Sequence, residues 1–172
     1  MQMTSRLTRV AAVAAALFAT TGAFAEGTFT PELGWGQISG GRIDRVGDRR
    51  QTLSFNAALG YRWDSGFGVR ALWTGAFDIF RDVDQPTFND FYGVQATGRF
   101  PLASKLDLTT GLGLGRTNLD TGVPGNRTDT LDGIVSAGLQ FRPFTHFALE
   151  LRADYLTHTH ERNVMLLAQV PF

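Results

Sequence analysis

The segment Phe147-Ala-Leu-Glu-Leu-Arg-Ala-Asp-Tyr-Leu156 alternates between two kinds of side chain. The apolar set consists of Phe147, Leu149, Leu151, Ala153 and Tyr155, and the other set contains the charges Glu150, Arg152 and Asp154. Successive side chains of a β-strand point to opposite faces, whereas a helix would mix the two sets around its circumference. This pattern predicts a β-strand with one apolar and one charged face.

The same period of two recurs along most of the chain. It is clear at residues 52–61, 67–74, 92–100, 106–115, 131–141 and 163–172. A weaker example at residues 29–39 contains Pro31, which is tolerated near the start of a strand or at a sheet edge. Together with the first segment, these stretches predict eight strands of about ten residues each.

The first 25 residues have the three-part layout of a secretory signal peptide. Arg6 and Arg9 precede an apolar run at residues 10–18, and Ala23-Phe24-Ala25 provides the small-residue cleavage site. The alternative of a membrane anchor fails because a spanning helix needs about 20 apolar residues. We therefore predict a signal peptide at residues 1–25 and one β-domain at residues 26–172.

Composition excludes several classes of function. The 16 basic and 16 acidic residues balance, which argues against a nucleic-acid partner recruited by a basic surface. The absence of cysteine excludes disulfides, thiolate zinc sites and a thiol nucleophile. The glycine-rich run at residues 111–115 lacks the spacing of a nucleotide-binding loop, and no helical pattern follows it.

The two faces of the strands differ in volume as well as polarity. The apolar face carries bulky side chains, whereas Gly111, Gly113 and Gly115 lie on the other face. Small residues suit the crowded interior of a narrow barrel, and lipid imposes no volume limit outside. We therefore predict an all-β fold, an eight-stranded antiparallel up-and-down transmembrane β-barrel. The alternative is a soluble ligand-binding β-barrel with the apolar face inward.

Charges on the inward face must pair because burial of an isolated charge is costly. We predict a lumenal polar network that plugs the interior of the barrel. Its candidate members are Arg70, Gln95, Glu150, Arg152 and Asp154.

The connections alternate in length. Short ones are expected at residues 63–66, 101–105 and 143–146, and longer polar ones at residues 40–50, 78–89 and 118–129. Bacterial outer-membrane barrels have short periplasmic turns and longer extracellular loops, with aromatic girdles at both interfaces. Aromatic residues such as Trp63 and Trp73 lie toward opposite ends of the predicted strands, in keeping with this arrangement.

With these features, the chain resembles the small outer-membrane β-barrel proteins of Gram-negative bacteria, the OmpA-like and OmpX-like group. The resemblance rests on Ala23-Phe24-Ala25, the hairpin-like runs at residues 59–70 and 138–150, the strand count and the C-terminal Phe172. It implies Sec-type export to the cell outer membrane and contact with lipid and lipopolysaccharide. It also implies help from the barrel-assembly machinery and periplasmic chaperones, with an assembly signal formed by Phe172, Val170, Ala168 and Leu166.

Some eight-stranded barrels are lipid A-modifying enzymes, so a deacylase-like activity is the enzymatic alternative. That family uses a His and a Ser near the outer end of a strand. Here His158 and His160 lie near such an end and Glu161 could orient a base, but His160 stands where that family has Ser. We expect no catalytic residues, no metal site and no cofactor. The expected role is structural or one of surface interaction.

Overall fold

A computed structural model describes residues 27–40, 52–77, 87–120 and 127–172 of the chain. The predicted signal peptide and most of the predicted long loops lie outside these residues. No helix in the described ranges is both long and apolar enough to cross a membrane.

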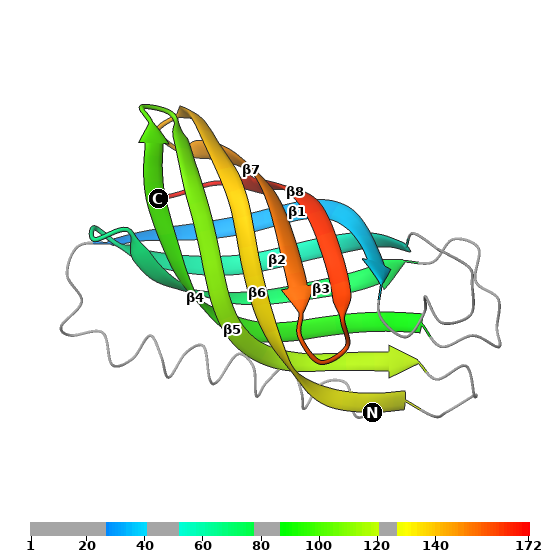
Figure 1. Cartoon of the computed structure of the whole chain (residues 1–172). Coiled ribbons are helices and arrows are strands. Elements are labelled where there is room, and N and C mark those ends of the chain that lie inside the picture. Colours follow the sequence, from blue (N-terminus) through cyan, green and yellow to red (C-terminus); the bar gives the residue numbers. More distant parts are fainter. Residues whose placement is uncertain (1–26, 41–51, 78–86, 121–126) are drawn as a thin grey trace.

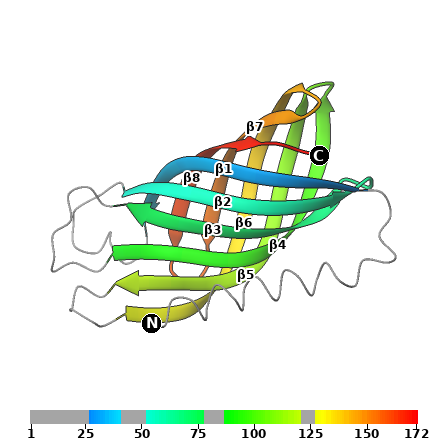
Figure 2. The same cartoon turned by 180° about the vertical axis from the view of Figure 1, so that it is seen from behind.

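The described residues form eight β-strands, each antiparallel to its neighbours. The strands are β1 (Gly27–Gly40), β2 (Thr52–Trp63), β3 (Phe67–Phe77), β4 (Thr87–Ala103), β5 (Leu106–Asp120), β6 (Arg127–Phe144), β7 (Phe147–Leu156) and β8 (Glu161–Gln169). They follow one another in chain order around a closed barrel (Figure 1). The reverse view shows β1 lying between β2 and β8, which completes the ring (Figure 2). The predicted up-and-down topology is confirmed.

The seam between the first and last strands is held by regular pairing. Trp35 lies opposite Leu166 in the register, and Gln37 lies opposite Val164. Beyond the last residue of β8, the N–H groups of Phe29 and Phe172 each donate to the other residue's carbonyl, at 3.1 and 2.9 Å. Closure gives both edge strands a partner, so neither exposes unpaired backbone groups along this seam.

The outer face of the barrel is apolar, as the alternation predicts. Leu112 and Leu131 are each 67% exposed, whereas Leu167, which faces the lumen, is 0% exposed. In β7 and β8 the burial pattern alternates almost without interruption along each strand. The apolar stripe therefore points outward, and the soluble alternative with an inward apolar face is wrong.

The turns at one end are shorter than the sequence predicts. The chain reverses at residues 64–66, 104–105 and 145–146. Pro101 and Pro143, expected in turns, lie within β4 and β6, beside shifts in the pairing register. A proline cannot donate to the ladder, and a β-bulge accommodates the missing N–H group.

At the opposite end the strands reach different heights. The predicted loop at residues 118–129 is shorter than expected, because β5 continues to Asp120 and β6 begins at Arg127. The pairing of β6 with β5 extends to Arg127, but its pairing with β7 extends only to Ile134. The β5–β6 hairpin therefore stands above the β7–β8 hairpin at this rim.

Candidate functional site

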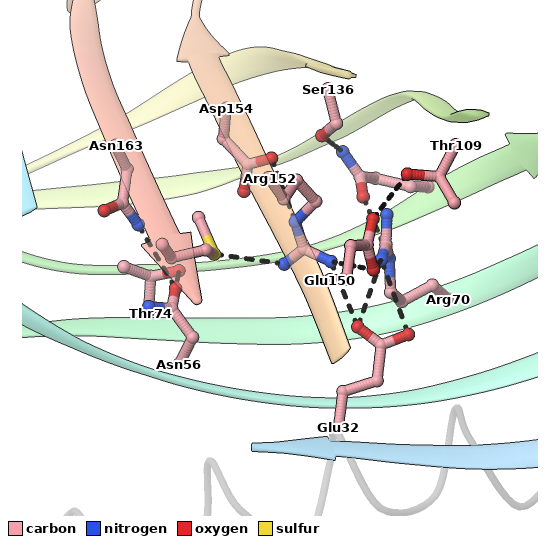
Figure 3. A network of polar contacts seen from close by, with 12 residues as sticks. Glu32, Asn56, Arg70, Thr74, Thr109, Ser136, Glu150, Arg152, Asp154 and Asn163 are labelled. Atoms are coloured by element: carbon pink, nitrogen blue, oxygen red, sulfur yellow. Dashed lines mark hydrogen bonds and ion pairs between the residues drawn. The ribbon is translucent and has the colours of Figure 1, made fainter. Parts of the chain in front are cut away.

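The candidate site is the interior of the barrel, where polar side chains from several strands meet. All five residues of the predicted lumenal network, Arg70, Gln95, Glu150, Arg152 and Asp154, are buried. Alternation in β3, β4 and β7 directs them inward, and the structure brings them into contact with one another. Figure 3 shows most of this network from close by.

Glu32 of β1 is the centre of the ion pairs. Its carboxylate accepts from Arg70 Nη1 at 3.1 Å and from Arg152 Nη1 at 3.0 Å (Figure 3). Arg152 Nε also lies 3.2 Å from Asp154 Oδ1. Glu150 Oε2 lies 3.9 Å from Arg70 and 4.0 Å from Arg152. We call Glu32, Arg70, Glu150, Arg152 and Asp154 the charged cluster.

Uncharged polar groups extend the charged cluster across the lumen. Arg70 Nε donates to Gln95 Oε1 at 3.2 Å, and Gln95 Nε2 donates to Ser136 Oγ at 2.6 Å. On the other side, Thr109 and Gln169 donate to the two oxygens of Glu150. These hydrogen bonds connect side chains from several strands, and such a connected network in a low-dielectric interior is rigid. The charged cluster itself contains three carboxylates and two guanidinium groups.

A second polar layer lies next to the charged cluster. Ser54 Oγ donates to Asn163 Oδ1 at 2.8 Å, and both Thr74 and Asn163 donate to Asn56 Oδ1, at 2.6 and 3.2 Å. These residues come from β2, β3 and β8. They continue the filling of the lumen toward the end opposite the short turns.

Toward that end the lumen also contains a cluster of apolar side chains, which the sequence analysis did not predict. Six buried side chains pack together there, and we call them the apolar cluster: Ile38, Leu72, Phe88, Phe91, Ile134 and Leu156. The lumen is thus filled by polar side chains together with this apolar cluster. Neither kind of packing leaves an open path for a hydrated solute through the described strands.

Sequence reasoning missed Glu32, because the weak pattern around Pro31 obscured which face it occupies. The signal is nevertheless present: Leu33 and Trp35 are exposed on the outer face, so alternation places Glu32 inside. A separate ion pair lies nearer the short turns, where the buried Asp107 is 2.7 Å from Arg142 Nε and 3.9 Å from Arg99 Nε.

The residues considered for catalysis lie at the rim opposite the short turns. His158 and His160 are exposed, whereas Glu161 is 3% exposed and begins the inward face of β8. His160 Nδ1 lies 2.7 Å from the Tyr155 hydroxyl, and the residue has a left-handed backbone with φ of 61°. Glu161 is therefore not placed to orient either imidazole. In the described ranges, no group of three or more His, Asp or Glu side chains could hold a metal ion.

Asp132 of β6, inside the barrel, accepts hydrogen bonds from the turn that carries these histidines. Its carboxylate accepts from the backbone N–H groups of His158 and Thr159 at 2.7 and 3.2 Å. It also accepts from the hydroxyls of Thr159 and Thr117, at 2.6 and 3.2 Å. Asp132 therefore fixes the β7–β8 turn to the lumen wall.

The four residues of the predicted assembly signal all lie on the outer face. Leu166, Val170 and Phe172 are exposed, and Ala168 is half-buried. Val170 donates its N–H to the carbonyl of Pro31 at 3.2 Å, so the terminal segment continues the seam with β1.

Comparison with known proteins agrees with this geometry. The model of a family described as the outer membrane protein beta-barrel domain matches residues 11–164. No curated protein gives a significant match. Among solved structures, Ail of Yersinia pestis in complex with the heparin analogue sucrose octasulfate is similar, with 21% identity, a TM-score of 0.58, and coverage of 86% of this chain and 99% of Ail.

Two further solved structures share the fold. Neisserial surface protein A (NspA) is 14% identical with a TM-score of 0.59, and the match covers 86% of this chain and 99% of NspA. The N-terminal β-barrel domain of Pseudomonas aeruginosa OprF is 14% identical with a TM-score of 0.61, and the match covers 86% of this chain and 100% of that domain.

Proposed function

Since the chain belongs to the outer membrane protein beta-barrel domain family and lies in the outer membrane of a Gram-negative cell, we propose that it has a structural or surface-interaction role and neither conducts solutes nor catalyses a reaction. The observation that carries this proposal is the filled lumen. Arg152, at its centre, is 1% exposed and is engaged by carboxylates from β1 and β7.

Planar-bilayer recording tests the non-conducting part of the proposal. Purified folded protein should give no large steady current, because an ion crossing the lumen would have to displace the charged cluster and enter the apolar cluster. An open porin measured in the same bilayer provides the positive control. A large steady current from the folded protein would contradict the proposal.

Lipopolysaccharide is the partner that we propose for the outer surface. Arg162 of β8 is exposed and lies opposite Tyr155 in the register, at the end away from the short turns. Within the described ranges it forms no ion pair, so its guanidinium is available to a lipid A phosphate. Arg116, by contrast, is exposed but already paired with Asp129 at 2.8 Å.

Lipopolysaccharide should therefore raise the unfolding temperature of the wild type more than that of Arg162→Gln. The matched control is Arg116→Gln, which should retain the full effect. Equal stabilisation of the wild type and Arg162→Gln would count against this contact.

We also propose that Phe172, Val170, Ala168 and Leu166 are recognised by the barrel-assembly machinery, aided by periplasmic chaperones. Their outward position supports this role, because truncating Phe172 removes little interior packing. Phe172→Ala should fold more slowly in vesicles that contain the purified machinery, yet at the wild-type rate in thin bilayers without it. Slowing in both systems would instead indicate a role in folding itself.

The lipid A deacylase alternative has no geometric support, since Glu161 is buried while His158 and His160 are exposed. Expression of the wild type and of His158→Ala should leave lipid A with the same acyl chains by mass spectrometry. Loss of an acyl chain with the wild type alone would establish an enzyme.

A further inference from the structure

The turn between β7 and β8 ends in a residue with an uncommon backbone conformation. His160 has a φ of 61°, and it is the one non-glycine residue with positive φ in the described part of the chain. Left-handed residues are often needed where a hairpin turns, but glycine adopts this conformation without steric cost. The turn therefore does not itself require a histidine at this position, and the imidazole can have a use of its own.

The imidazole of His160 is held on the outside of the barrel. The preceding residue, Thr159, is buried and donates to Asp132 in the lumen, whereas His160 is exposed. His160 Nδ1 lies 2.7 Å from the hydroxyl of Tyr155, and the centroids of the two rings are 6.2 Å apart. When this hydroxyl donates to Nδ1, the proton of the neutral ring is on Nε2. Tyr155 thereby makes Nε2 a hydrogen-bond donor.

Arg162 lies next to the same tyrosine. It is opposite Tyr155 in the pairing of β7 with β8, and opposite Ser39 in the pairing of β1 with β8. All of these residues are exposed, and within the described ranges the outward positions of β1 and β7 carry no carboxylate. Tyr155 is thus a neighbour of both His160 and Arg162, and we call these three residues the rim triad.

The rim triad lies where the outer face of β8 changes from apolar to polar. Leu166 and Val164 are exposed apolar residues, and Arg162 and His160 follow them toward the rim opposite the short turns. Tyrosine is enriched at such a boundary between hydrocarbon and water. The triad is therefore at the level of the lipid headgroups, and a ligand that reaches it from the side of the barrel is a lipid.

We propose that Arg162 and His160 together bind one phosphate group of lipid A, and that Tyr155 positions His160 for this contact. The inference rests on the lipopolysaccharide contact of Arg162 proposed above, to which it adds a second ligand and a positioning residue. The guanidinium offers paired N–H donors, and imidazole Nε2–H offers one more. One phosphate has enough oxygen atoms to accept from both groups.

The first test follows the ring nitrogens of histidine by NMR, using the folded protein in phosphatidylcholine nanodiscs. Lipid A should shift the Nε2 signal of His160 saturably, whereas dephosphorylated lipid A and inorganic phosphate at the same concentration should not. His158, exposed in the same turn, provides the internal control. Equal shifts with lipid A and its dephosphorylated form would overturn the proposal.

The second test separates binding from closure of the turn. His160→Gly retains the left-handed backbone, so the free energy of unfolding without lipid A should not fall. Its affinity for lipid A should nevertheless fall about tenfold, the loss expected when a hydrogen bond to a charged group is removed. His158→Gln is the matched control and should bind as the wild type does. A less stable His160→Gly with unchanged affinity would show that His160 only closes the turn, which would refute the site.

The role of Tyr155 needs a double substitution. Tyr155→Phe removes the hydroxyl and keeps the ring, so it should weaken lipid A binding in the wild type but not in His160→Gly. Equal weakening in both backgrounds would show that Tyr155 does not act through His160.

Arg162→Gln distinguishes this inference from the function on which it rests. All three single variants, Arg162→Gln, His160→Gly and Tyr155→Phe, should weaken lipid A binding. If Arg162→Gln alone does so, the Arg162 contact stands and the rim triad is refuted. If none of them does, both proposals fail. Gel mobility before and after boiling verifies that each variant is folded.

Discussion

Glu32 and Arg152 form an ion pair at 3.0 Å although 120 residues separate them in the chain. Their strands, β1 and β7, are not neighbours, because β8 lies between them. The pair therefore exists only once the barrel has closed. Pairing of this buried carboxylate with Arg152 therefore depends on the pairing of β1 with β8.

Replacing Glu32 by Gln should strongly destabilise the folded barrel. Arg70 and Arg152 would lose the carboxylate that they share, and both are buried. Removing one partner of a buried ion pair costs about 3–5 kcal/mol. Urea-induced unfolding in lipid vesicles, followed by tryptophan fluorescence, measures the change in the free energy of unfolding.

The matched control is Asp129→Asn, which breaks the exposed Arg116–Asp129 pair. Solvent screens an exposed pair, so this substitution should cost much less than Glu32→Gln. Equal losses in the two variants would show that burial within the charged cluster does not determine the effect.

A methyl group at Gly113 should impair folding, whereas one at Gly60 should be tolerated. A Cβ at position 113 would overlap the carbonyl oxygen of Val94 on the neighbouring strand. At position 60 the nearest atom, the carbonyl oxygen of Thr30, lies 3.6 Å from the added Cβ, an ordinary contact. We expect Gly113→Ala to lose about 1–3 kcal/mol.

The folded fraction of each glycine variant can be read from gel mobility before and after boiling. Gly60→Ala should match the wild type. If Gly113→Ala also matches it, the close approach of β4 and β5 is not needed for folding.

A charged residue on the outer face should lower the free energy of unfolding more at the middle of a strand than near a turn. Leu112 is 67% exposed within β5, and Phe144 is exposed at the last residue of β6. Leu112→Lys should lose about 2–4 kcal/mol, and Phe144→Lys about 0–1 kcal/mol, because lysine is most costly at the bilayer midplane. Reversible unfolding in vesicles measures both, and equal costs would contradict the assigned depths.

Replacing Asp132 by Asn should loosen the β7–β8 turn without opening the barrel. An amide nitrogen cannot accept the hydrogen bonds that a carboxylate oxygen receives from His158 or Thr159. Hydrogen exchange of the His158 and Thr159 amides should accelerate at least about tenfold. Asp90→Asn, on β4, should leave these two rates unchanged, and wild-type protection in Asp132→Asn would rule out the fastening role.

Alternation predicted the strands and their faces because lipid outside and close packing inside impose the same period of two on each strand. In the structure Arg70, Gln95, Glu150, Arg152 and Asp154 are all buried. Alternation failed at Glu32, where Pro31 and the small residues Gly34 and Gly36 weaken the contrast between faces. It also misplaced Pro101 and Pro143, since a bulge can retain a proline within a strand.

The partners within the charged cluster could not be predicted in the same way. Alternation decides which face a residue occupies, but the register between strands decides its height in the lumen. Glu32 meets Arg152 only because of the stagger with which β1 and β7 pair with β8. The apolar cluster was missed because Ile38, Phe91 and Ile134 lie on the lumenal faces of their strands. The sequence analysis expected those faces to be polar or small.

The unequal height of the strands at the outer rim has a practical result for epitope display. Each strand residue adds about 3.4 Å of length, and β6 continues beyond its last pairing with β7 as far as Arg127. A peptide inserted between Asp120 and Arg127 would thus start further from the membrane than one inserted after Leu156. Antibodies approaching a cell through a dense sugar coat should reach the first insertion and miss the second.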